Sequence, residues 1–320
     1  MKLLIVDDDP MILELLTEII NATTTYEVLR AGDAFEALDF INGQDGGDID
    51  CFLLDIQMPG KNGIELCREI RAIKAHRFTP VLMLTAMTEK KYVDDAYSAG
   101  ANDYIKKPFE VDEITRRLTL AQERVAQQRA DAERALEEVE PVSHGILDRI
   151  HIHDVDNVVD YFAIENYLGS LPKRSLFGSV ALSLQVRSID EIYAHLSAYQ
   201  FNGLIQDVAE AISDTLRDFN CLISYAGYGT FVTVIEDKQL PSRGRLADEV
   251  NLRLHTIGAH LVLPDQHQVR VICGDVIRLM GTNSERIQDS LAQSASSAVR
   301  IAEETEVGLE KFWFMGQVSR

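Results

Sequence analysis

Five short apolar runs in the first third of the chain alternate with segments of helical periodicity. The runs are KLLIV, YEVLRA, CFLL, PVLMLT and DYI, at residues 2–6, 26–31, 51–54, 80–85 and 103–105. Segments such as MILELLTEII and GIELCREIRAI lie between them, with apolar residues at helical spacing. Strands that alternate with helices of this length form a parallel sheet covered on both faces. We therefore expect a doubly wound α/β domain with a five-stranded parallel sheet over residues 1–120.

Polar side chains follow the predicted strands where each one ends. Asp7 and Asp8 follow the first strand, Asp55 the third, Thr85 ends the fourth, and Lys107 comes just after the fifth. Ligands of such sheets bind beyond the carboxyl ends of the strands. Carboxylates on neighbouring strands repel each other unless a hard cation such as Mg²⁺ binds both, and a cation with a lysine would stabilise a phosphoryl group. Taken alone, the Asp-Asp-Asp run before a proline also has the pattern of a helix N-cap.

The stretches LLIVDDDP, FLLDIQMPGKNG, LMLTA and DYIKKPF resemble the receiver domain of two-component response regulators over residues 1–120. The resemblance implies a flavodoxin-like fold in which Asp55 accepts a phosphoryl group from a histidine kinase or phosphotransfer protein. Mg²⁺ would be held by Asp7, Asp8, Asp55 and the backbone carbonyl of Gln57; Lys107 would pair with the phosphoryl oxygens, and Thr85 and Tyr104 would form the switch pair. The alternative is a flavodoxin-like domain in which the acids cluster by chance.

The helical pattern that begins at Val111 continues to Pro141. Residues 111, 118, 125, 132 and 139 and residues 114, 121, 128 and 135 form a seam that is apolar except at Gln128. Such heptad spacing predicts a helical linker over residues 110–141 that pairs as a parallel two-stranded coiled coil in a homodimer. The seam contains few large residues, so a single solvated linker helix is the alternative.

The remaining residues, 145–320, have a mixed α/β pattern. We expect strands at 179–186, 260–263 and 268–276, helices at 201–219, 244–256 and 284–302, and a hairpin, CLISYAGYGTFVTVI, at 221–235. This order, with glycines in the hairpin, resembles the GGDEF domain of diguanylate cyclases, whose fold is related to that of nucleotide cyclases. VRVICGDV and SAVRIAEE are similar to the last strand and the closing helix of that family.

The chemical positions of the GGDEF pattern are occupied differently here. The two acids of the first strand fall on Gln185 and Arg187, the substrate-facing asparagine falls near Tyr193, and the acidic pair of the hairpin falls on Gly229 and Thr230, although Gly227 matches. Nucleotide chemistry with two cations needs carboxylates to hold the metals. We therefore expect a degenerate domain without cyclase activity. An ordinary β-hairpin whose glycines permit positive φ would give the same pattern.

The charge of the chain bears on its partners. The sequence has 31 Lys and Arg against 51 Asp and Glu, a net charge of −20, which disfavours binding to nucleic acid. No apolar run approaches the length of a membrane span, and acidic residues follow the N-terminal apolar run too early for a secretory signal. We therefore expect a cytoplasmic protein without nucleic-acid or membrane partners.

These patterns predict a response regulator that is phosphorylated on Asp55 and signals through a dimeric helical linker. Its output domain would be catalytically inactive and would act by binding a protein partner that the sequence does not identify. One alternative is a sensor in which this domain binds GTP or cyclic di-GMP. Another is a functional cyclase with displaced ligands.

Overall fold

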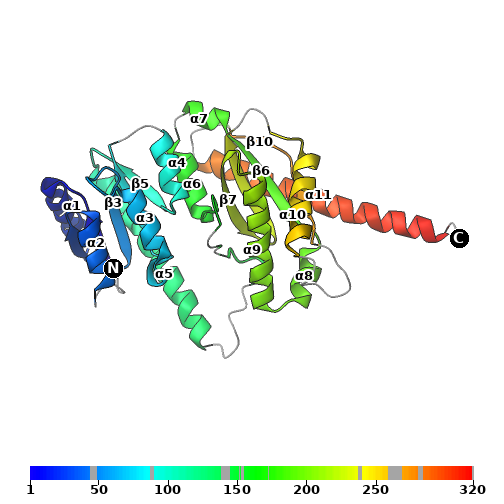
Figure 1. Cartoon of the computed structure of the whole chain (residues 1–320), viewed down its shortest axis with the longest axis horizontal. Coiled ribbons are helices and arrows are strands. Elements are labelled where there is room, and N and C mark those ends of the chain that lie inside the picture. Colours follow the sequence, from blue (N-terminus) through cyan, green and yellow to red (C-terminus); the bar gives the residue numbers. More distant parts are fainter. Residues whose placement is uncertain are drawn as a thin grey trace. The chain divides into compact units, whose positions relative to one another are not determined.

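The computed structural model describes residues 1–43, 49–86, 90–137, 145–150, 152, 155–171, 173–236, 240–258, 269–279 and 284–318, and places side chains in all of these except 127–137, 173–174, 284 and 308–318. The chain forms two compact units, Met1–Val139 and Glu140–Arg320 (Figure 1).

The first unit is built on a five-stranded parallel sheet with strand order β2-β1-β3-β4-β5. The strands are β1 (Lys2–Val6), β2 (Glu27–Ala31), β3 (Cys51–Asp55), β4 (Val81–Thr85) and β5 (Asp103–Lys106). Side chains alternate between the two faces of the sheet, so Leu3 and Ile5 join one buried cluster and Leu4 and Val6 join the other. The expected five-stranded parallel α/β fold is confirmed.

Helices cover both faces of this sheet. They are α1 (Pro10–Thr23), α2 (Ala34–Asn42), α3 (Gly63–Ala72), a 3₁₀ turn η2 (Lys74–His76), α4 (Lys90–Ser98) and α5 (Val111–Glu137). Polar side chains fix where three of them begin: Asp9 caps α1, Asp33 caps α2, and Asn62 forms a reciprocal capping box with Glu65 at α3.

The first half of α5 packs against the sheet of the first unit. Ile114, Leu118 and Ala121 are buried in the cluster that also contains Leu16 and Ile20 of α1. The Tyr26 hydroxyl donates to Oε1 of Gln122 at 2.5 Å. These seam residues therefore already have packing partners within their own chain. The seam residues 128, 132 and 135 lie where side chains are not described, and the expected helix end at Pro141 lies outside the described residues.

The second unit contains an antiparallel sheet with order β10-β6-β8-β7, in which β9 also pairs with β6. The strands are β6 (Val180–Val186), β7 (Asn220–Gly227), β8 (Thr230–Glu236), β9 (Val271–Cys273) and β10 (Ile277–Arg278). The strand expected at 268–276 is shorter than predicted, and the one expected at 260–263 lies outside the described residues.

Helices of this unit pack on both faces of its sheet. They are α6 (Tyr161–Ser170), α7 (Lys173–Gly178), α8 (Ile189–His195), α9 (Ala198–Thr215), α10 (Arg243–Ile257) and α11 (Ser284–Val318). Leu184 faces the core with α9 and α10, whereas the neighbouring Ser183 points to the other face and bonds Ser294 of α11. The end of α11 extends away from the rest of the unit (Figure 1). Within the described residues, no helix is long and apolar enough to cross a membrane.

Replacing Leu118 with alanine should destabilise the first unit by about 2–5 kcal/mol, because the side chain is fully buried in the core of that unit. Val111→Ala on the same helix should change stability by less than about 0.5 kcal/mol, because Val111 is 46% exposed. Calorimetry of the full chain would compare the two variants, with the transition of the first unit identified by its shift on adding beryllofluoride, a mimic of the phosphoryl group expected on Asp55. Equal destabilisation by the two substitutions would contradict the packing of α5 against the first unit.

Candidate functional site

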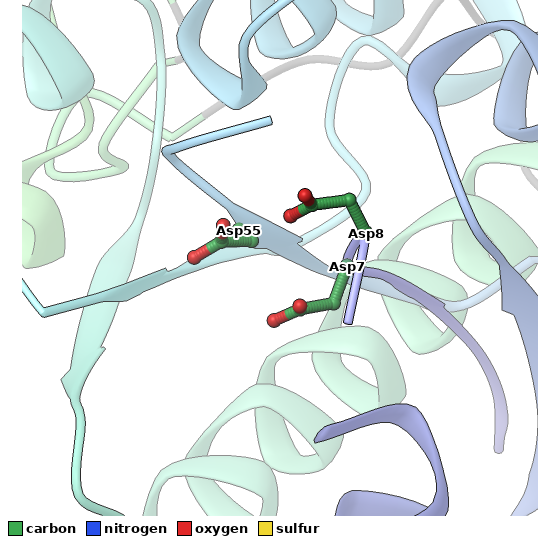
Figure 2. A group of neighbouring side chains, drawn as sticks. All are labelled: Asp7, Asp8 and Asp55. Atoms are coloured by element: carbon green, nitrogen blue, oxygen red, sulfur yellow. The ribbon is translucent and has the colours of Figure 1, made fainter. Parts of the chain in front are cut away.

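Three carboxylates meet at the carboxyl edge of the parallel sheet. Asp7 and Asp8 directly follow β1, and Asp55 ends β3, which pairs with β1 through Val6 and Leu54. The three side chains each offer an oxygen within 4.8 Å of the others (Figure 2). Asp7 and Asp55 are buried, whereas Asp8 is exposed. An oxygen-only group of this kind suits a hard divalent cation such as Mg²⁺.

The acidic run after β1 divides into two roles. The Asp9 carboxylate accepts a hydrogen bond from the Met11 amide at 2.9 Å and caps α1, where Pro10 is the first helical residue. The Asp9 amide donates to Oδ1 of Asp7 at 3.0 Å. The helix-cap interpretation therefore holds for Asp9 alone, and Asp7 and Asp8 belong to the acidic group.

Lys107 provides the positive charge beside this group. Its Nζ lies 2.6 Å from Oδ2 of Asp7 and 3.0 Å from Oδ1 of Asp55. The Lys107 amide donates to the Thr85 carbonyl at 2.7 Å, which holds the loop after β5 next to the end of β4. The sheet thus brings together residues that are up to one hundred positions apart in sequence.

The pKa values of this site reflect crowding of negative charge. Burial raises the pKa of Asp55, and repulsion from Asp7 and Asp8 adds to the effect, while Lys107 opposes it. Burial alone would lower the pKa of Lys107, but its hydrogen bonds to Asp7 and Asp55 outweigh burial and raise the pKa. One lysine therefore compensates the acidic group only in part, and a further positive charge would relieve the repulsion.

The remaining predicted receiver residues lie around this group. Thr85 is buried at the end of β4, and Tyr104 lies on β5 opposite Met83. Gln57 is exposed, two positions beyond Asp55. Gln57 follows the strand that carries Asp55, Tyr104 lies on the strand that precedes Lys107, and Thr85 ends the strand between those two.

Gly63 is a residue of this site to which the sequence did not assign a role. A Cβ atom at Gly63 would lie 2.1 Å from the backbone oxygen of Asp55, so only glycine lets α3 approach the end of β3 this closely. The Gly63 amide also donates to the carbonyl of Ile56 at 3.2 Å. The signal in the sequence was a glycine at the first position of a helix, immediately after a capping asparagine.

In the second unit, the strand and hairpin positions of the predicted degenerate site do come together. The Thr230 hydroxyl donates to Oε1 of Gln185 at 2.5 Å, and Nε2 of Gln185 donates to the Tyr228 carbonyl at 2.8 Å. Both side chains are buried. The result is a neutral hydrogen-bond network between positions that the GGDEF resemblance assigned to lost metal ligands. Within the described residues, the only group of three or more acidic, histidine or cysteine side chains spaced for a metal is the one in the first unit.

The other predicted positions of this unit have structural surroundings. Tyr193 packs edge-on against Phe201, with ring centroids 4.9 Å apart. The Arg187 amide donates to the Arg270 carbonyl at 2.8 Å. Gly227 and Gly229 both have positive φ. The two turn residues, Tyr228 and Gly229, have φ of +51° and +67°, as a two-residue type I′ hairpin turn requires.

Comparison with known proteins agrees with the geometry of the first unit. Residues 3–119 match the family model of the response regulator receiver domain. DNA-binding response regulator MtrA of Mycolicibacterium smegmatis is 36% identical over 117 residues, which are 37% of this chain and 48% of that protein. Transcriptional regulatory protein ResD of Bacillus subtilis is 38% identical over 126 residues, 39% of this chain and 50% of that protein.

The matched stretches thus span about half the length of these relatives. A solved receiver domain of a Pseudomonas aeruginosa sensor histidine kinase, with a magnesium ion coordinated in its active-site cleft, is 28% identical and covers 39% of this chain and 97% of its own, with a TM-score of 0.34. The family match and the placement of three acids and a lysine at the edge of a parallel sheet lead to one conclusion: residues 3–119 form the receiver domain of a response regulator.

Proposed function

We propose that Asp55 accepts a phosphoryl group from a phosphohistidine on a sensor histidine kinase or phosphotransfer protein. The observation that best supports this proposal is the position of Asp55, which lies within the acidic group, with its Oδ1 3.0 Å from Nζ of Lys107. An oxygen of Asp55 attacks phosphorus as the bond from phosphorus to the donor imidazole breaks, and the imidazole leaves with the electron pair. Lys107 then pairs with the new phosphoryl oxygens, which favours the transferred state.

Asp7, Asp8, Asp55 and the backbone carbonyl of Gln57 are the proposed ligands of Mg²⁺. The acidic group supports this assignment, because its oxygens lie close together and Lys107 compensates only part of their charge. When bound, Mg²⁺ neutralises charge between the carboxylates and the incoming phosphoryl group.

Thr85 and Tyr104 are the proposed switch pair. Phosphorylation adds oxygens near the buried end of β4, and they can draw the Thr85 hydroxyl towards them. Tyr104 lies on the next strand, and its neighbour Asp103 is held by Arg117 of α5 in an ion pair of 2.5 Å. A change in β5 would thus act directly on the helix that leaves the receiver.

A homodimer formed through the linker helix is the proposed route of the signal. Because Ile114, Leu118 and Ala121 are buried inside the receiver, a second copy has to pair with the later part of the seam. The part of α5 before it would act as a rigid extension of the receiver core.

The second unit is proposed to be an inactive, GGDEF-like output domain that binds a downstream protein. Its closed Gln185 and Thr230 network supports the absence of cyclase activity. The alternative of a GTP or cyclic di-GMP sensor needs free amides at the hairpin turn. Here the Tyr228 amide donates to the Ile146 carbonyl and the Gly229 amide to the Tyr225 hydroxyl, which favours protein binding over nucleotide binding.

A DNA-binding output is the less favoured possibility. The names of MtrA and ResD describe a DNA-binding and a transcriptional regulator, but the similarity covers only 37% and 39% of this chain. The net charge of −20 also disfavours contact with phosphate backbones.

An Asp8→Asn variant should bind Mg²⁺ at least about tenfold more weakly, because it removes one charged ligand of the acidic group. Asp9→Asn is the matched control, since asparagine caps a helix as well as aspartate does. Calorimetric titration of the full chain with Mg²⁺ would measure both. The proposed ligand set is wrong if Asp9→Asn weakens binding as much as Asp8→Asn does.

Asp55→Asn should abolish phosphoryl transfer to the chain and any change of oligomeric state that depends on it. Asp50→Asn is a suitable control: Asp50 immediately precedes β3 and accepts from the Lys2 amide at 2.8 Å, a bond that asparagine can keep. Intact-mass spectrometry after incubation with a phosphodonor would detect the transfer, and light scattering would give the oligomeric state. Continued phosphorylation of Asp55→Asn, or loss of it in both variants, would contradict the assignment.

Full-length protein activated with beryllofluoride should form no cyclic di-GMP from GTP with Mg²⁺ or Mn²⁺, because Gln185, Gly229 and Thr230 provide no carboxylate. Chromatography of the nucleotides would test this, with an active diguanylate cyclase added to a parallel sample as the positive control. Product in the sample without that enzyme would identify the second unit as a cyclase.

A further inference from the structure

The hairpin turn between β7 and β8 is held on both of its sides. On one side Gln185 donates to the Tyr228 carbonyl, as described above, and the Tyr228 hydroxyl donates to Asp190 of α8. On the other side the Tyr228 amide donates to the Ile146 carbonyl at 2.7 Å. The second contact comes from residues 145–150, which we call the strap.

The position of the strap leaves room only for a glycine at residue 227. The φ of Gly227 is +93°, and a Cβ atom there would lie 2.3 Å from the backbone oxygen of Leu147. The Leu147 backbone thus rests directly on the glycine, and any larger residue would push it away. Gly229 is different, because the nearest atoms to its Cβ position belong to the side chain of Ile189, at 2.8 Å, and not to the strap.

The strap is folded by a single internal turn, which is too short to persist once the strap leaves the unit. The Gly145 amide donates to Oδ2 of Asp148 at 2.7 Å, and the Asp148 amide donates to the Gly145 carbonyl at 2.9 Å. Arg149 lies over the ring of Tyr161, 4.0 Å from its centroid. Leu147 is 72% exposed. Ile146 and Ile150 are partly buried against the core of the unit, and no residue of the strap is fully buried. The strap therefore opens at lower free-energy cost than the sheet beneath it.

The strap is also the part of the second unit that the linker reaches soon after the last described residue of α5, Glu137. Any pull or rotation of the linker therefore acts on the strap before it reaches the sheet. We propose that the strap is a releasable contact whose docking on the hairpin turn depends on the phosphorylation state of the receiver. Release would uncover the Tyr228 amide and the backbone of Gly227. This proposal rests on the function proposed above.

Amide hydrogen exchange of the full chain, followed by NMR, tests the strap directly. Activation with beryllofluoride should reduce protection of the Tyr228 and Asp148 amides by about tenfold or more, while amides inside the β7–β8 ladder, such as Ile223 and Val232, keep theirs. Gly227→Ala should release the strap without activation. Gly229→Ala, which introduces the same kind of backbone strain without touching the strap, should leave the Asp148 amide protected.

The outcomes separate this proposal from the function on which it rests. If receiver amides respond to beryllofluoride while protection at Tyr228 and Asp148 stays unchanged, the proposed release of the strap is wrong and the receiver switch remains supported. Equal loss of Asp148 protection in Gly227→Ala and Gly229→Ala would also overturn it, because the contact with Leu147 would then not be what holds the segment. Receiver amides that do not respond at all would overturn both proposals.

Discussion

Three carboxylates share the edge of a parallel sheet with one lysine, and the receiver is organised around that imbalance of charge. Pairing of β1 with β3 places Asp7 beside Asp55, and the Lys107 ammonium bridges the two from the loop after β5. Because burial and repulsion raise the pKa of Asp55 in spite of Lys107, the group is poised for an added cation and for chemistry that changes its charge.

Much of this site could be predicted from the sequence, since strand ends and their polar residues are local signals. The residues alone left the division of the acidic run open, because Asp-Asp-Asp before a proline fits metal ligands and a helix cap equally well, and only the family resemblance assigned Asp7 and Asp8 to the metal. The contacts of Asp9 with the Met11 amide and of Asp7 with Lys107 distinguish the two roles. The seam of α5 was ambiguous for a similar reason, because heptad spacing also suits a helix packed on its own sheet, as Ile114 and Leu118 are.

In the second unit the glycine hairpin and the order of the elements were accessible to sequence reasoning, whereas the function of Gly227 was not. A glycine with positive φ in a turn predicts only a turn. Glycine is needed there because the backbone of Leu147, eighty residues earlier in the chain, leaves no room for a Cβ atom. A local sequence pattern does not reveal such a contact. The strand end and the hairpin do meet, through the uncharged side chains of Gln185 and Thr230.

The two sheet edges differ in whether their polar groups are satisfied. In the receiver, repulsion among acids remains after Lys107 is counted, so adding a phosphoryl group and a cation changes the balance of forces. At the hairpin, the Gln185 amide, the Thr230 hydroxyl and the Tyr228 backbone groups satisfy one another or the strap, and Gln185 and Thr230 carry no charge. Such a network has no uncompensated charge that could bind a cation or a phosphoryl group. A change at this edge has to be conformational, and the strap, none of whose residues is fully buried, is the attachment proposed to move.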